Sequence, residues 1–168
     1  GTDHSITLSQ PNSASNDINN FNIGGGNIAT VTGSSNTGFG EDNLNALTIG
    51  FSNAALGYEA LSSLTTGTFN VAIGVLSSKT NSVGTSNTSI GNNSLFASTG
   101  SNNTSIGAQS LRQATTGAKN TAIGYESGFA ITTGAKNVII GSNTGSTIAT
   151  SNNNIIISDG DGNNRIQV

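Results

Sequence analysis

The sequence predicts an all-β fold, a parallel β-solenoid or β-roll of about eight coils. Asparagine recurs at intervals of 16 or 17 residues, with a bulky apolar residue three positions later and a glycine four positions later. A fixed short period indicates units that bury apolar side chains only by stacking on one another. Each coil is named below by its asparagine, counted as position 0. The recurring asparagines are Asn20, Asn36, Asn53, Asn70, Asn87, Asn103, Asn120, Asn137 and Asn154.

Each coil is predicted to hold one short strand between two corners. The segment 70–73 alternates larger and smaller side chains with period 2, which is typical of a strand. Glycine at position 4 and again near position 14 marks the corners. Helix is disfavoured because each of the 23 glycines would cost about 0.5–1 kcal/mol in a helix interior. We expect position 3 to be the apolar core column: Ile23, Phe39, Leu56, Ile73, Ile90, Ile106, Ile123, Ile140 and Ile157.

The asparagine column is predicted to form a structural ladder. Equivalent residues of stacked coils lie about 4.8 Å apart. A side-chain amide both donates and accepts, so it can link one coil to the next and satisfy corner backbone groups. The predicted ladder consists of Asn36, Asn53, Asn70, Asn87, Asn103, Asn120 and Asn137.

The composition is polar and nearly uncharged. Charged residues make up 8% of the chain, against about 25% in ordinary soluble proteins, and the net charge is −3. Five basic residues do not supply the stripe that nucleic acid requires. No apolar run approaches the ~20 residues of a membrane-spanning helix, so membrane insertion is not expected. Low apolar content is also typical of disorder, but the columns stay in phase, which favours an ordered rod. No cofactor is expected.

The repeat defines the expected domain organisation. Residues 1–19 are predicted to be an N-terminal extended segment or linker, and residues 20–158 the β-solenoid. Residues 159–168 are predicted to form a turn and a capping strand that protects the last coil. The run 159–163 has the start of a calcium-loop spacing, but a turn is the preferred interpretation.

One chain offers a thin interior, and this favours self-association. Position 2 is small through most of the repeat, and it should point opposite to positions 1 and 3. We therefore expect a strip of small residues on an outer face, along which a parallel homotrimer packs. The strip consists of Gly38, Ala55, Ala72, Ser89, Ser105 and Ala122.

The motif Asn-(Thr/Val)-(Ala/Ser)-Ile-Gly at 70–74, 87–91, 103–107 and 120–124 resembles the head repeats of trimeric autotransporter adhesins. The run 115–125 is similar to repeats of bacteriophage and viral tail fibres, and 152–168 resembles the segment leading to their C-terminal chaperone. The resemblance implies a homotrimeric fibre of a virion tail or an extracellular cell surface. The adhesin repeat is shorter than this one, so the coil cross-section differs.

Position 9 is the outer column with unusual content. It carries Lys79, Phe96, Arg112 and Phe129 on four successive coils. Aromatic rings interleaved with cations are suited to stacking on a sugar ring or holding a partner surface, so these residues are the predicted receptor-binding site. Packing against a sister chain is the alternative role.

The predicted function is therefore a non-enzymatic attachment fibre segment that presents a rigid surface to a host-cell glycan or protein receptor. Two alternatives stay open. Threonines at positions 12 and 13 are compatible with an ice-binding solenoid. Asp42 and Glu59 occupy the same column in adjacent coils, at a spacing that a capsule-degrading tailspike would use. Solvated outer carboxylates are the preferred interpretation of that pair, and no catalytic or metal-binding residue is predicted.

Overall fold

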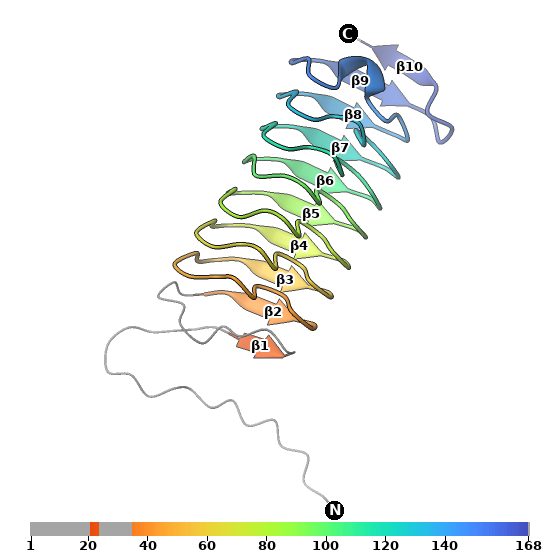
Figure 1. The fold of residues 1–168 in the computed structure, drawn as a ribbon. Helices are drawn as coiled ribbons and strands as arrows, with labels where there is room; N and C mark the ends of the chain where they lie inside the picture. The colour runs from red at the N-terminus through yellow and green to blue at the C-terminus, as the bar shows by residue number, and fades with distance from the viewer. Residues whose placement is uncertain (1–20, 24–34, 168) are drawn as a thin grey trace, which may run out of the picture.

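The computed structural model describes residues 21–23 and 35–167, and it is a rod of stacked coils (Figure 1). The predicted segment 1–19 lies outside the described residues. The strands are β1 (Phe21–Ile23), β2 (Thr37–Phe39), β3 (Ala54–Leu56), β4 (Val71–Ile73), β5 (Thr88–Ile90), β6 (Thr104–Ile106), β7 (Thr121–Ile123), β8 (Val138–Ile140), β9 (Ile155–Ser158) and β10 (Asn164–Gln167).

The strands form one sheet in sequence order, β1 to β10. Pairing is parallel from β1 to β9, and equivalent positions face each other, as where Val71 of β4 lies opposite Ala54 and Thr88. Seven complete coils run from Asn36 to Asn154. The single helical element in the described ranges is a 3-10 turn, η1 (Ser146–Ile148). The predicted all-β solenoid is confirmed.

The predicted direction of the strand side chains is wrong. Ala72 at position 2 is fully buried, whereas Ile73 at position 3 is 38% exposed and Leu56 is 50% exposed. From β2 to β9 the position-3 residues are exposed or half-buried, and position 2 is buried throughout. The small-residue strip is therefore the inner face of the sheet, and the isoleucine column lies outside.

The core is filled from the opposite side of the coil. Leu61 and Leu64, at positions 8 and 11, are fully buried and cluster with Ala55 and Ala72 of the strands. Because protein interiors are close-packed, leucines in this layer leave the strand room only for alanine or serine. The interior of these coils therefore has no room for the position-3 isoleucines, which lie on the outer face.

The position-8 leucines reach the core from an unusual backbone conformation. Leu61 has φ +53°, in the left-handed region, and Leu44, Leu95 and Leu111 have similar values. Such values are uncommon for residues other than glycine. Here they turn the chain so that the leucine side chain points into the interior.

Two apolar clusters are separated by a polar stretch of core. One spans residues 44–72 and the other residues 95–156. Between them Ser77, Ser78 and Ser89 are buried, and the hydroxyls of Ser77 and Ser78 each donate to the Ser89 Oγ at 2.8 Å. Buried hydroxyls that pair with one another avoid the cost of an unsatisfied polar group.

The position-4 glycines form the tight corners that the sequence predicts. Gly57 has φ +137°, and a Cβ placed on it would lie 2.6 Å from the carbonyl oxygen of Gly74 in the next coil. No L-residue side chain is accommodated at such a distance. The corner therefore requires glycine for both conformation and space.

The asparagine column forms hydrogen bonds from coil to coil. Asn70 donates its backbone N–H to the Oδ1 of Asn53 at 3.0 Å, and its Nδ2 donates to the carbonyl oxygen of Gly84 at 2.9 Å. The same pattern recurs at Asn53, Asn87, Asn103, Asn120 and Asn137. Each asparagine thus ties its own coil to the preceding one and to the second corner.

Candidate functional site

The outward side of the sheet carries a column of apolar residues at position 3, flanked at position 1 by a column that mixes threonine with apolar residues. We call the outward residues at positions 1 and 3 of β2–β9 the sheet face. Val71 and Ile73 stand side by side on β4, and each strand stacks an equivalent pair on the next. Apolar surface on this scale is unusual on a chain that remains single in water. The exposed large apolar members include Leu56, Ile73, Ile123, Ile140 and Ile155.

Aromatic side chains extend the exposed apolar surface near the first coils. Phe51 and Phe69 meet edge to face with ring centroids 5.2 Å apart, and both are exposed. Tyr58 follows the corner glycine of its coil and is exposed as well. The charge of Glu59 foremost, together with partial burial, raises the pKa of Tyr58 above its ordinary value of 10.0, so the phenol stays neutral.

The position-9 column brings three of the four predicted receptor-binding residues together. The Arg112 guanidinium carbon lies over the Phe96 ring, 5.6 Å from its centroid, and over the Phe129 ring at 5.9 Å. These distances are within the range of cation–π attraction. All three side chains are half-buried. Because the rings belong to the preceding and following coils, the arginine lies between them along the rod axis.

Lys79 does not join this stack. Its Nζ pairs with the Oε2 of Glu59 at 2.5 Å, one coil earlier. The sequence placed Lys79 and Glu59 in two separate hypotheses, a receptor column and a carboxylate pair. The available signal was their opposite charge at position 9 of one coil and position 6 of the coil before it.

The carboxylates of the described coils do not form the pair that the capsule-degrading alternative requires. Glu59 is engaged with Lys79 rather than matched with Asp42. Across residues 35–167 no cluster of three or more histidine, cysteine or acidic side chains is placed to hold a metal ion. The capsule-degrading alternative therefore gains no support from the geometry.

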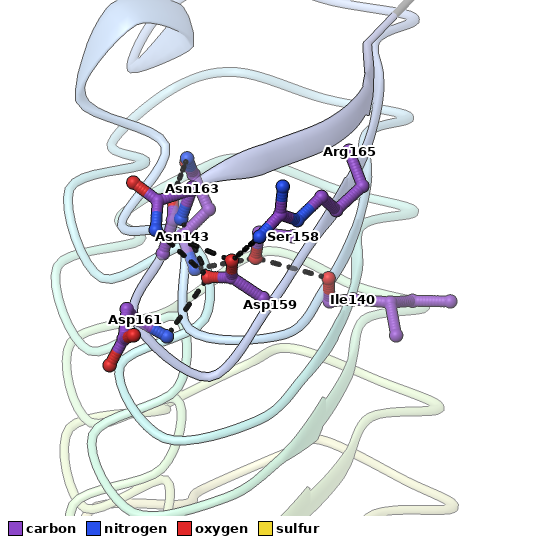
Figure 2. A network of polar contacts seen from close by, with 8 residues as sticks. Ile140, Asn143, Ser158, Asp159, Asp161, Asn163 and Arg165 are labelled. Carbon is purple, nitrogen blue, oxygen red and sulfur yellow. Dashed lines mark hydrogen bonds and ion pairs between the residues drawn. The ribbon is translucent and has the colours of Figure 1, made fainter.

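The acidic turn after β9 is a closed hydrogen-bond network (Figure 2). The Oδ1 of Asp159 accepts the backbone N–H groups of Asp161 and Asn163, each at 3.0 Å, and its Oδ2 pairs with Arg165 of β10. The backbone donor of Asn163 foremost lowers the pKa of Asp159 below its ordinary value of 3.8. β10 then pairs antiparallel with β9. The carboxylate thus holds the predicted turn together.

A threonine column has a role that sequence reasoning missed. The Oγ1 of Thr48 donates to the carbonyl oxygen of Thr65 at 3.0 Å, and that of Thr65 donates to Ser82 at 2.8 Å. Thr115 and Thr132 donate in the same way. The 17-residue recurrence of threonine was the available signal. These hydroxyl hydrogens at position 12 are directed at the neighbouring coil.

Comparisons with protein-family models, curated proteins and solved structures return no match for this chain. In the part of the chain that the structure describes, no helix is both long and apolar enough to cross a membrane.

Proposed function

We propose that this chain is a non-enzymatic segment of a homotrimeric attachment fibre, a phage tail fibre or trimeric adhesin head on a virion or cell surface. The observation that carries the proposal is the position-3 column of the sheet face, which is apolar on every strand from β2 to β9. A second copy of the chain is the occupant that matches it, because a face that repeats with one period fits an identical rod in register.

Length and composition support this assembly. Seven coil steps of about 4.8 Å give a face roughly 34 Å long. The exposed leucine and isoleucine side chains along it are 38% to 50% exposed in the single chain, and burying each contributes about 1 kcal/mol or more. The number of copies, three, comes from the resemblance of the repeats to trimeric fibres. We propose the sheet face as the interface, because the small-residue strip is buried inside the rod.

The remaining surface supports a role in attachment. Position 9 follows a core residue on the layer that packs against the inner side of the sheet. It therefore lies across the core from the sheet face and stays accessible when that face is covered. A rigid rod that presents such a column is suited to contacting a receptor.

Light scattering after size-exclusion chromatography tests the assembly. The wild-type chain is expected at three times its own mass at micromolar concentration. Ile73→Asn with Ile123→Asn places two amides in the sheet face and is expected to give monomers. Val83→Asn is the matched control, because Val83 is 53% exposed at position 13, off that face. A monomeric wild-type protein, or equal dissociation by the control, contradicts the proposal.

Binding to target cells tests the attachment role separately. A Phe96→Ser, Phe129→Ser variant is expected to remain trimeric and to lose target binding. Dissociation of this variant into monomers would instead assign the column to contacts between chains.

A further inference from the structure

Arg112 lies between two rings and forms no ion pair with any of the described residues. Its guanidinium lies between Phe96 and Phe129. Both described ion pairs, Lys79 with Glu59 and Arg165 with Asp159, lie elsewhere. Arg112 is half-buried, and among the described residues no side chain or carbonyl oxygen accepts a hydrogen bond from its guanidinium. A guanidinium fixed in this way loses little side-chain freedom when it binds a ligand.

Comparison with Lys79, at the same position of an earlier coil, shows which group Arg112 lacks. Lys79, also at position 9, is neutralised by Glu59 at position 6 of the preceding coil. The position equivalent to Glu59 for Arg112 is Asn93, whose amide is neutral and donates to the Oδ1 of Asn92 at 2.6 Å. The geometry that supplies a carboxylate to Lys79 supplies none to Arg112.

We propose that the Phe96–Arg112–Phe129 stack binds the carboxylate of an acidic sugar residue. The carboxylate takes the place that Glu59 has beside Lys79 and accepts two N–H bonds from the planar guanidinium. The exposed parts of the Phe96 and Phe129 rings pack against the C–H groups of the sugar. The inference rests on the proposed attachment function, since it names the class of receptor that the fibre contacts.

The surroundings favour a sugar over a peptide. The backbone beside the stack is already bonded from coil to coil, as where the Gln113 N–H donates to the Phe129 carbonyl oxygen at 3.2 Å and the Leu95 N–H to Ser110 at 2.9 Å. A peptide would find no free strand edge there to pair with. The stack carries one cation, on a chain of net charge −3, which suits a ligand with a single carboxylate rather than a polyanion.

Titration of the trimeric protein with glucuronate, followed by NMR shifts of the Phe96 and Phe129 rings, tests the proposal. Saturable binding is expected with a Kd on the order of millimolar for the monosaccharide. Glucose, which has the same ring without the carboxylate, is expected to bind at least about tenfold more weakly. Equal binding of both sugars overturns the proposal.

Asn93→Glu is the decisive variant, because it leaves the stack intact and installs the missing carboxylate. Glu59 has φ +52° and Asn93 has φ +55°, so the same backbone conformation already carries a glutamate two coils earlier. Glucuronate affinity is expected to fall about tenfold or more through internal competition. Arg112→Lys is expected to weaken binding by a similar factor, since lysine lacks the planar fork. Glu59→Gln, which frees Lys79 two coils away, is the control and should leave affinity unchanged. Unchanged affinity in Asn93→Glu overturns the proposal.

Three further probes separate the ligand classes. Acetate binding as tightly as glucuronate removes the role of the sugar and overturns the proposal. Tighter binding of glucose 6-phosphate or of an N-acetyl-glutamate amide at Arg112 also overturns it, in favour of phosphate or peptide. Light scattering on the same samples reports the oligomeric state, so loss of assembly is distinguished from failure of the sugar site.

Discussion

The coils near residue 61 and those near residue 128 fill the same interior from opposite sides. In the earlier coils Leu61 points inward against Ala72 of β4. In the later coils the equivalent residues are Gly128 and Ile139, so the large side chain of this pair comes from β8, while Ile131 at position 11 stays buried in the opposite layer. A Cβ placed on Gly128 would lie 2.9 Å from Leu111 and 3.3 Å from Ile139, which shows that the space is taken.

This exchange teaches that the solenoid has a fixed interior volume, which either layer can fill. Gly145 and Ile156 repeat the later arrangement in the next coil. Position 2 is thus a core column in both regions, small where the opposing layer carries leucine and large where it carries glycine. Position 3 takes no part in the exchange, because it lies on the outer side of the strand.

The largest expected effect is on stability, from changes at the position-4 corner glycines that both regions share. Gly57→Ala and Gly124→Ala each place a Cβ close to the carbonyl oxygen of the next corner, at 2.6 Å and 2.5 Å, and each imposes a left-handed φ on alanine. We expect each to destabilise the fold by on the order of 3 kcal/mol. Urea unfolding at fixed protein concentration measures the effect. A clearly smaller loss of unfolding free energy at one site would show that the tolerance of the corner depends on how the core is filled.

A swap of core volume between layers is expected to have an intermediate effect. Gly128→Leu should destabilise the fold by about 1–3 kcal/mol, because the added side chain overlaps Leu111 and Ile139. Its φ of +63° also adds backbone strain for leucine, of the kind that Leu61 carries at +53°.

Adding Ile139→Ala reproduces the earlier arrangement and should recover most of the lost stability. A double-mutant cycle in urea unfolding measures the coupling, expected at about 1–3 kcal/mol. Additive losses from the two changes would contradict a shared interior volume.

The smallest expected effect concerns the terminal hairpin, which is held by charge rather than by core volume. Folding lowers the pKa of Asp159 below 3.8, so its stabilising contribution is complete above the unfolded pKa and is lost as pH falls through the folded one. The hydrogen-exchange protection factors of the β10 amides should therefore fall below about pH 4, while those of β4 stay high. Asp159→Asn should remove this pH dependence. An unchanged acid response in that variant would assign the effect to another carboxylate.

Much of the fold was predictable because the repeat is a series of local requirements. Asn70 needs a hydrogen-bond partner in each neighbouring coil, and Gly57 needs a positive φ and space for the next corner; both columns are visible in the printed sequence. The direction of Ile73 was not predictable from one column alone. The signal that predicts it is the pairing of Leu61 with Ala72 and of Gly128 with Ile139, which requires comparing two columns across coils.

The candidate site was predictable in its members and not in its contacts. Phe96, Arg112 and Phe129 share a column, so a fixed period places them in one stack. Lys79 has an ion-pair partner and Arg112 has none among the described residues. The difference lies at position 6 of the preceding coil, which is Glu59 for Lys79 and Asn93 for Arg112. The offset between positions 9 and 6 is a property of the folded corner.

The sequence by itself determined the coil length, the corners and the asparagine ladder, since each follows from a backbone need that recurs with the period. Which side of the strand is the core was decided by the tertiary structure alone. Alternation with period 2 shows that a strand has two different faces. Only the layer across the interior, with Leu61 or with Gly128, decides which face fits inside and which lies on the outside.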